Sequence, residues 1–273
     1  MHVPTLRAAR AAACLAVLWW MPGDPGRATA ADGNDVWPGL RASLFGQRAI
    51  ADAGRELQLI VPRRAEDAAV VPIAIRASAA AGAGGWRKVY LIIDKNPSPV
   101  SAVFEIDEQI GRVDIETRVR VEDYSTVRAI VEAVDGSLRM TTRDIKAAGG
   151  CSAAANKRDA DPNSLGQMRW QLPDPVAAGE SVPVTLLIRH PNTSGLAMDQ
   201  VSRLYEPPHF VRQVRVTYRG RQVFRADVDF SISENPAFRF TFRADGDGML
   251  EASVVDSNAL QFRSAVPVAP LGR

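Results

Sequence analysis

The stretch VRAIVEAV-DG-SLRMTTRDI, residues 127–145, decides the fold class of this chain. Two runs rich in β-branched and apolar residues flank Asp135-Gly136, a dipeptide that readily adopts the positive φ angles of a tight hairpin. Residues 127–134 and 138–145 are therefore predicted to be neighbouring antiparallel strands. The second of these strands leads the chain to Gly149 and Gly150.

Strand patterns continue upstream of this hairpin. Residues 70–75 and 89–93 are apolar and β-branched, and residues 103–106 and 113–121 follow in a nearly alternating pattern. Together they predict a half-buried sheet. The only persuasive helix candidate is the segment from Pro38 to Ile50, because proline suits a first helical turn; a packed N-terminal arm explains this segment about as well.

Downstream, the pattern restarts at residues 168–170 and 182–188. Residues 210–218 and 222–230 bracket Arg219-Gly220, and residues 238–242 and 249–255 bracket a turn at 245–248, so both pairs are predicted hairpins. Short, evenly spaced strands favour β-sandwiches, since a parallel sheet needs helical crossovers. We therefore predict an all-β fold with two tandem sandwiches around separate cores.

The first thirty residues predict the compartment. Arg7 and Arg10 precede an apolar run at residues 11–21, and small residues end the segment at Ala30. This is the pattern of a secretory signal peptide cleaved after Ala30, and the run is too short to span a bilayer. We expect a periplasmic protein without a membrane anchor, divided into a signal peptide (1–30), a first sandwich (31–148), a linker (149–166) and a second sandwich (167–273).

Charge and cysteine content narrow the possibilities. The full chain has 33 Lys and Arg against 31 Asp and Glu, and removal of the signal peptide leaves equal numbers of each. That balance argues against nucleic-acid binding. Cys14 leaves with the peptide, so Cys151 is the only remaining thiol and no internal disulfide can form.

Cys151 itself is predicted to be exposed on a flexible arm. Gly149 and Gly150 precede it and Ser152 follows, in a loop of small and polar residues. A tolerated buried cysteine is the alternative, and the composition of the loop argues against it. We expect such an exposed thiol to carry function and to contribute little to stability.

Several motifs resemble a known family. The stretches at residues 94–99, 117–120 and 135–151 resemble SoxY, the sulfur-carrying subunit of the periplasmic Sox sulfur-oxidation system, and those at 188–191, 208–211 and 233–236 resemble its partner SoxZ. The arrangement is similar to fused SoxYZ-like carriers associated with quinoprotein dehydrogenases. This resemblance implies two immunoglobulin-like sandwiches and a cysteine, Cys151, to which cargo is attached covalently.

The surroundings of Cys151 raise two further points. The cations Lys146, Lys157 and Arg158 are candidates to increase the thiolate fraction or to hold an anionic adduct, although ordinary solvated loop charges explain them as well. The SoxY arm reads Gly-Gly-Cys-Gly-Gly, whereas Ser152-Ala153 follow the cysteine here and the chain continues. The arm is thus a loop fixed at both ends.

Other chemistry has little support. His190 and His209 lack a carboxylate at ligand spacing, so we expect packing or a hydrogen bond rather than a metal site. Asp245 and Asp247 lack the other ligands of a calcium loop, so a turn accounts for them. We expect no metal and no cofactor.

Three functions remain open, in decreasing order of preference. The first is a periplasmic thiol carrier that presents a substrate, most simply a sulfur species, to partner enzymes. The second is a docking or maturation module for a periplasmic quinoprotein dehydrogenase. The third is a thiol-dependent enzyme, for which no base lies nearby in the sequence; we therefore expect the chain not to be an enzyme.

Overall fold

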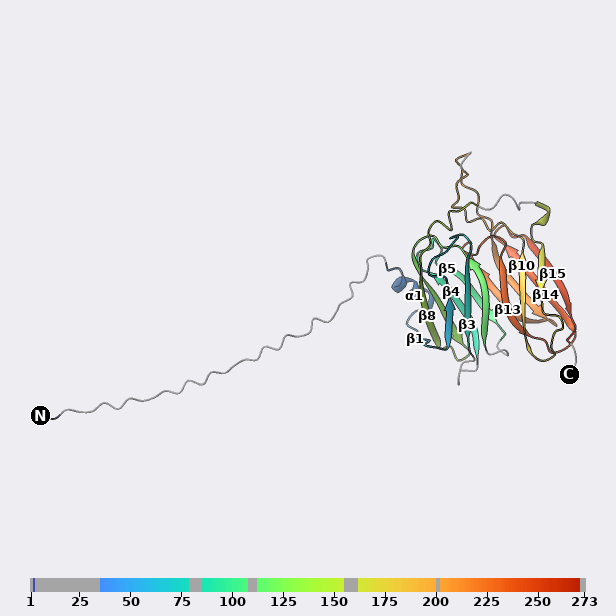
Figure 1. Ribbon diagram of the computed structural model, residues 1–273, viewed down its shortest axis with the longest axis horizontal. Coiled ribbons are helices and arrows are strands. Elements are labelled where there is room, and N and C mark those ends of the chain that lie inside the picture. Colours follow the sequence, from blue (N-terminus) through green and yellow to red (C-terminus); the bar gives the residue numbers. More distant parts are fainter. Residues whose placement is uncertain are drawn as a thin grey trace. The chain divides into compact units, whose positions relative to one another are not determined.

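The computed structural model describes His2 and residues 35–78, 85–107, 112–154, 162–199 and 202–270. The predicted signal peptide lies outside these residues except for His2. Within the compact unit Val36–Arg273, the helix α1 (Trp37–Phe45) comes first (Figure 1). It begins beside Pro38 as predicted but ends before Ile50, which already belongs to a strand. None of the described helices is long and apolar enough to span a membrane.

The strands of the first half precede Cys151 in the chain. They are β1 (Ile50–Asp52), β2 (Leu57–Ile60), β3 (Val71–Ala77), β4 (Trp86–Ile93), β5 (Val100–Ile106), β6 (Val113–Val119), β7 (Ser125–Ala133) and β8 (Leu138–Ile145). In β3 and β6 every second residue is buried, as expected for strands with one face toward a core.

The second half begins with a short 3₁₀ turn, η3 (Pro162–Ser164). Its strands are β9 (Met168–Gln171), β10 (Ser181–Ile188), β11 (Val211–Tyr218), β12 (Arg221–Val228), β13 (Ala237–Arg243), β14 (Gly248–Asp256) and β15 (Gln261–Val268). The strands β1, β2 and β15 were not predicted from the sequence.

Two sheets run through both halves. One has the order β1-β8-β7-β4-β5-β12-β11-β14-β15 and the other the order β2-β3-β6-β13-β10-β9. The halves therefore join edge to edge, through β5 with β12 in one sheet and β6 with β13 in the other. Figure 1 shows the strands of the two halves standing side by side. The prediction of an all-β fold with two tandem sandwiches is confirmed.

The expectation of separate cores is wrong, because one cluster of buried apolar residues extends from β2 to β15. Aromatic rings fill it where the halves meet: the centroids of Phe224 and Phe240 lie 4.3 Å apart in a stacked pair, and Phe104 lies 5.9 Å from Phe224. Such pairs add about 0.5–1.5 kcal/mol each to the effect of burial. The two sandwiches therefore share one continuous core.

The hairpin predictions are confirmed at two of three places. The strands β7 and β8 pair across Asp135-Gly136, and β11 and β12 pair across Arg219-Gly220, whose φ angles of 52° and 77° suit a tight turn. The strands β13 and β14, however, belong to different sheets. The predicted third hairpin is therefore a crossover between the two layers, and the alternating pattern of its strands is equally compatible with either connection.

Candidate functional site

The segment carrying Cys151 leaves β8 and lies against the residues that follow β6. The Gly149 N–H donates to the Glu122 carbonyl at 2.8 Å, and the Gly150 N–H donates to the Val121 carbonyl at 3.0 Å. A Cβ at Gly150 would lie 2.0 Å from the Ala68 carbonyl oxygen. Glycine is therefore needed here for close backbone packing, which differs from the flexibility predicted for this position.

Glu122 holds the arm, residues 149–152, in place. Its Oε2 accepts the N–H groups of Cys151 at 2.8 Å and Ser152 at 3.1 Å, and its Oε1 accepts the Ser152 hydroxyl at 3.1 Å. From the second half, the Ser194 hydroxyl donates to the Cys151 carbonyl. The predicted free arm is thus docked in the structure, and one carboxylate makes most of the side-chain contacts to it.

Cys151 is fully buried, which contradicts the predicted exposed thiol. Burial and the nearby Glu122 carboxylate raise the pKa of the thiol to about 12, against smaller opposing effects of Arg120 and of a hydrogen bond with Ser231. A thiol of this pKa is protonated at neutral pH and is a poor nucleophile. The loop composition misled the prediction because the burial comes from segments distant in sequence.

Of the three cations predicted to support the thiol, only Lys146 lies among the described residues, and it is not among the groups that affect the thiol pKa. Lys146 is exposed, and its backbone pairs with the residues around Arg64 in an isolated bridge. Lys157 and Arg158 lie outside the described residues. The cation that opposes the rise in the thiol pKa is Arg120, which directly follows β6. Its position between Val119 and Val121 is the sequence signal that identifies it: a charge inside an apolar run.

Arg120 is buried and bonds only to backbone. Its Nη1 donates to the Gly150 carbonyl at 3.2 Å, and its Nη2 donates to the Asn192 carbonyl at 3.3 Å. Burial lowers the pKa of the guanidinium, while the charges of Glu234, Cys151 and Asp67 act in the opposite direction. Arg120 thus connects the arm to the second half.

Asn96 fixes the segments around the sulfur. Its Nδ2 donates to the Arg120 carbonyl at 2.8 Å and to the Ser231 hydroxyl at 3.0 Å, while its Oδ1 accepts the Glu122 N–H at 2.9 Å. Ser231 comes from the second half, just before the stretch at 233–236. The stretches at residues 94–99, 117–120 and 135–151 therefore meet around Cys151, although the roles of Asn96, Glu122 and Ser231 were not predicted.

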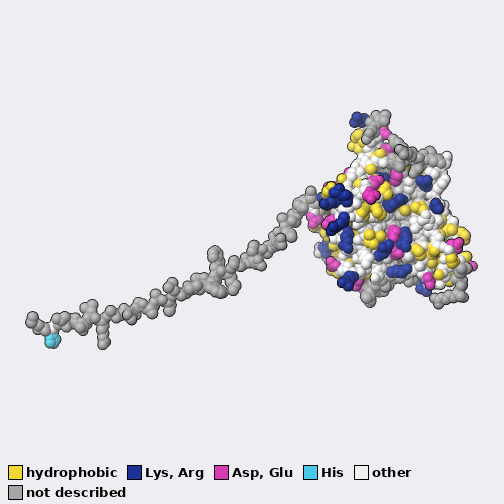
Figure 2. All heavy atoms as spheres, in the orientation of Figure 1, with side chains coloured by type: hydrophobic (Ala, Val, Ile, Leu, Met, Phe, Trp, Pro, Cys, Tyr) yellow, Lys and Arg dark blue, Asp and Glu magenta, His cyan; other side chains and the backbone are white. Residues whose placement is uncertain are grey.

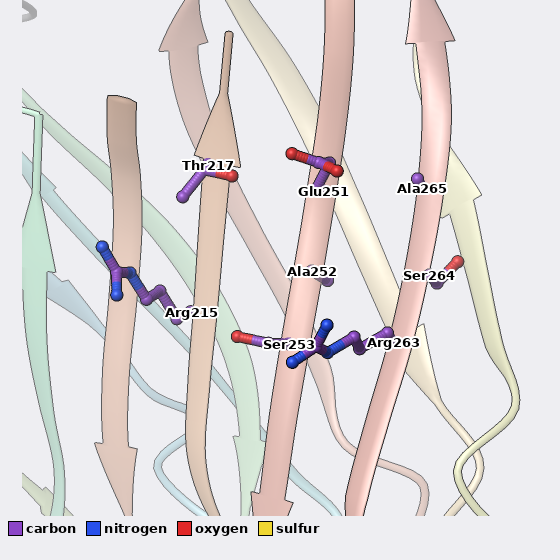
Figure 3. A pocket seen from close by; sticks show the side chains of 8 residues that line it. All are labelled: Arg215, Thr217, Glu251, Ala252, Ser253, Arg263, Ser264 and Ala265. Atoms are coloured by element: carbon purple, nitrogen blue, oxygen red, sulfur yellow. The ribbon is translucent and has the colours of Figure 1, made fainter. Parts of the chain in front are cut away.

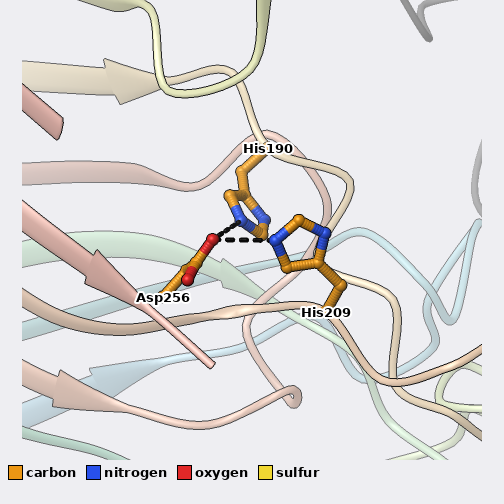
Figure 4. Close-up of side chains that lie close together, drawn as sticks. All are labelled: His190, His209 and Asp256. Atoms are coloured by element: carbon orange, nitrogen blue, oxygen red, sulfur yellow. Dashed lines mark hydrogen bonds and ion pairs between the residues drawn. The ribbon is translucent and has the colours of Figure 1, made fainter. Parts of the chain in front are cut away.

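A second polar cluster lies beyond Asn192. His190 Nε2 is 3.5 Å and His209 Nε2 is 2.7 Å from Asp256 Oδ2. Figure 4 shows the two rings converging on the carboxylate. The two rings are 4.6 Å apart in an edge-to-face pair. Burial, together with the charge of His209, lowers the pKa of His190 to about 4. No carboxylate lies near the histidines in the sequence, and Asp256 reaches them from the end of the distant strand β14.

The hydrogen bonds of this cluster fit a metal poorly. The Asn192 N–H donates to His190 Nδ1 at 3.1 Å, so the proton of the neutral ring lies on Nε2, the nitrogen that faces Asp256. A metal ligand needs that nitrogen bare. Asp256 Oδ1 already accepts the N–H groups of Asn258 at 2.9 Å and Leu260 at 2.8 Å. The three side chains are therefore best described as a hydrogen-bonded cluster. A hydrogen bond is one of the two roles that the sequence predicted for the histidines.

Other surface features carry no predicted site residue. A hollow of about 530 Å³ lies on the outer face of β11, β14 and β15, and Figure 3 shows Arg215, Arg263 and Glu251 among the side chains that line it. On the face displayed in Figure 2, Lys and Arg alternate with Asp and Glu rather than forming one basic patch.

Comparison with known protein families identifies both halves. The family of sulfur oxidation protein SoxY matches residues 41–151, and the family of sulphur oxidation protein SoxZ matches residues 168–267. The chain belongs to the SoxY and SoxZ families, joined in one polypeptide. It is a sulfur-oxidation carrier of the SoxYZ type, with sulfur-oxidation enzymes as its class of partner. The SoxY match ends on Cys151 itself.

Other comparisons add little. No match was found among curated proteins. Among solved structures, two forms of a superoxide reductase (neelaredoxin) from Ignicoccus hospitalis are similar to this chain at 13% identity, with TM-scores of 0.30 and 0.31; they cover 43% and 41% of this chain, and 90% and 86% of their own. A β-glycosidase from Bacteroides vulgatus matches at 8% identity and a TM-score of 0.24, covering 78% of this chain and 24% of its own.

Proposed function

We propose that this SoxYZ-type chain is a periplasmic carrier that holds a sulfur species covalently on Cys151 and presents it to partner enzymes. The observation that carries the proposal is the position of Cys151: it is the only cysteine among the described residues, and the SoxY match ends on it. The contacts of Asn96, Glu122 and Ser231 around it support this assignment. The predicted signal peptide supports export to the periplasm.

Attachment of cargo to Cys151 requires the arm, residues 149–152, to leave its docked position against Glu122. A buried thiol with a pKa of about 12 cannot react where it lies. Undocking breaks the three contacts to Glu122 and returns the thiol to water, where its pKa falls toward the ordinary value of about 8.5. We therefore expect the docked arm to be the protected form and the undocked arm to be the reactive one.

Attachment through a sulfur–sulfur bond is an oxidation. The Cys151 S–H and an S–H of the cargo lose two protons and two electrons as the bond forms, so a partner oxidoreductase must accept the electrons. This requirement fits a carrier that depends on partner enzymes.

Mass spectrometry of the protein purified without reductant from its native host tests the proposal. We expect a discrete mass increase that maps to Cys151 and disappears on reduction. The Cys151→Ala protein should carry no adduct and should stop sulfur oxidation in cells. Unmodified Cys151 together with normal pathway flux in the Cys151→Ala strain would contradict the carrier and favour a docking module for a quinoprotein dehydrogenase.

N-terminal sequencing of the exported protein tests the compartment independently. We expect the mature chain to begin at Ala31 in the periplasmic fraction. Retention of Met1, or recovery of the protein from the cytoplasmic fraction, would contradict export.

A further inference from the structure

Arg120 is a buried cation with no carboxylate in direct contact. Its side chain belongs to the largest fully buried ones, and only 2% of the residue is exposed. None of the described acidic side chains lies within 4 Å of its guanidinium, and its Nε has no hydrogen-bond partner. Its two hydrogen bonds, to the carbonyls of Gly150 and Asn192, are long at 3.2 and 3.3 Å.

Such an arrangement is costly for the resting protein. Buried arginines are normally paired with a carboxylate or another anion, because an uncompensated buried charge loses its hydration without replacement. Other arginines of this chain follow the rule: Arg128, also largely buried, makes a bidentate contact with Asp94, with Nη2 to Oδ2 at 2.6 Å. Arg120 therefore lacks such a direct contact, and the charges of Glu234 and Asp67 act on it only from a distance.

The sulfur of Cys151 is among the groups whose negative charge would stabilise the Arg120 guanidinium. The guanidinium bonds to the carbonyl of the residue directly before the cysteine, and it is the cation that favours a negative charge on the sulfur. The neutral thiol does not provide this charge. A cargo with an anionic end would.

We propose that Arg120 binds the negative charge of the group carried on Cys151, so that the carrier holds anionic adducts more tightly than neutral ones of similar size. This inference rests on the proposed carrier function. It assigns Arg120 as a positioning and specificity-determining residue for cargo that ends in an oxyanion, such as a sulfonate.

The backbone of Arg120 is held by contacts that do not involve the arm. The Arg120 N–H donates to the Ser231 carbonyl at 2.7 Å, and its carbonyl accepts Asn96 Nδ2 at 2.8 Å. Cys151 is fully buried in the docked arm, so there is no room for atoms added to the sulfur. A loaded arm must therefore move outward, which takes the Gly150 carbonyl away from Arg120 Nη1. An adduct oxygen then takes the place of that carbonyl, and a charge-assisted hydrogen bond replaces a neutral one.

Chemical loading tests the inference on the full chain. Tetrathionate converts the thiolate into Cys–S–S–SO₃⁻ and releases thiosulfate, whereas methyl methanethiosulfonate yields the neutral Cys–S–S–CH₃ and releases methanesulfinate. Complete modification is verified by mass spectrometry. The measured quantity is the melting temperature of the anionic form minus that of the neutral form, so that baseline differences between variants cancel.

In the wild-type protein we expect the anionic form to melt higher by about 2–4 °C, the shift that corresponds to one good charge interaction in a protein of this size. The difference should disappear in Arg120→Gln and Arg120→Met and persist partly in Arg120→Lys. The matched control is Arg118→Gln, two residues away, which removes the same charge from a guanidinium that bonds to the Asn235 carbonyl. It should keep the full difference.

Two results would overturn the role of Arg120: equal melting temperatures for the two wild-type adducts, or the same difference in Arg120→Gln as in the wild type. The first needs no variant, so a folding defect of the substitutions does not protect the proposal. Neither result would contradict the carrier function, which is tested separately by the adduct on natively purified protein. If that adduct is absent, the carrier function is contradicted, but the preference of Arg120 for a negative charge is not.

Discussion

The arm at residues 149–152 and the cluster of His190, His209 and Asp256 are both buried polar sites, and they are built in opposite ways. In the cluster, Asp256 accepts four hydrogen bonds, two from histidines and two from backbone N–H groups. At the arm, one partly buried carboxylate, Glu122, holds the chain, and the nearby cation Arg120 bonds only to backbone carbonyls. The contrast is between a cluster whose acceptor is fully used and an arm that, under the proposed function, detaches for loading.

The largest expected effect comes from breaking the cluster. Asp256→Ala removes four acceptor contacts and leaves two buried histidines without their partner, so we expect a loss of about 3–5 kcal/mol in the free energy of unfolding. Urea denaturation measures it. Asp227→Ala, which removes a more exposed carboxylate, should cost less than about 1 kcal/mol. A similar cost for both variants would show that the cluster does not anchor the fold.

A pH titration sharpens the same point. The pKa of His190 is about 4 in the folded protein and near 6.5 when unfolded, so the unfolded chain binds the proton more readily. The stabilising contribution is therefore present above pH 6.5 and is lost as the pH falls toward 4, by up to about 3 kcal/mol. Urea denaturation at several pH values should show this slope in the wild type and a flatter one in His190→Gln. Equal slopes would contradict the neutral, buried assignment of His190.

Releasing the arm should cost less stability but change reactivity strongly. Glu122→Gln removes the charged acceptor of three hydrogen bonds and the carboxylate that opposes thiolate formation, so we expect Cys151 to react with iodoacetamide roughly 10–100 times faster. The free energy of unfolding should fall by only about 1–3 kcal/mol. The neighbouring, exposed Asp123→Asn is the matched control and should leave the labelling rate unchanged. Slow labelling in Glu122→Gln would show that other contacts hold the arm.

The smallest effect concerns the cysteine itself. Because Cys151 is buried, Cys151→Ser places a hydroxyl where a sulfur packs and should cost about 1–3 kcal/mol, rather than the negligible amount expected for an exposed loop residue. Thermal unfolding measures this cost. Cys151→Ser in the Glu122→Gln background should cost less, since the arm is then already released. Full additivity of the two changes would indicate that the arm stays docked without Glu122.

The sequence predicted the strands with clear period-two patterns and failed where the pattern is weak. The strand β15 lies at a sheet edge with few buried residues and contains Pro267, and β1 and β2 are very short. The crossover from β13 to β14 was read as a hairpin because strand patterns do not say which sheet a strand joins. The shared core follows from pairing between β5 and β12, for which a single sequence carries no local signal.

For the site, the sequence identified Cys151 and the motif segments but not the environment of the sulfur. Small residues around a thiol are compatible both with an exposed loop and with tight backbone packing, and at Gly150 the second explanation holds. Arg120 and Glu122 lie about thirty residues upstream, so no spacing rule connects them to the cysteine. The carboxylate of Asp256 was missed for the same reason.

The pairing of β5 with β12 also bears on how the protein must be made. Each half produced alone would present an edge strand with unpaired backbone groups, a ready template for self-association into aggregates. A single polypeptide supplies both edges in equal amounts and keeps them tethered, which gives each edge a high local concentration of its correct partner. Gene fusion thereby removes any need to match the expression levels of two subunits.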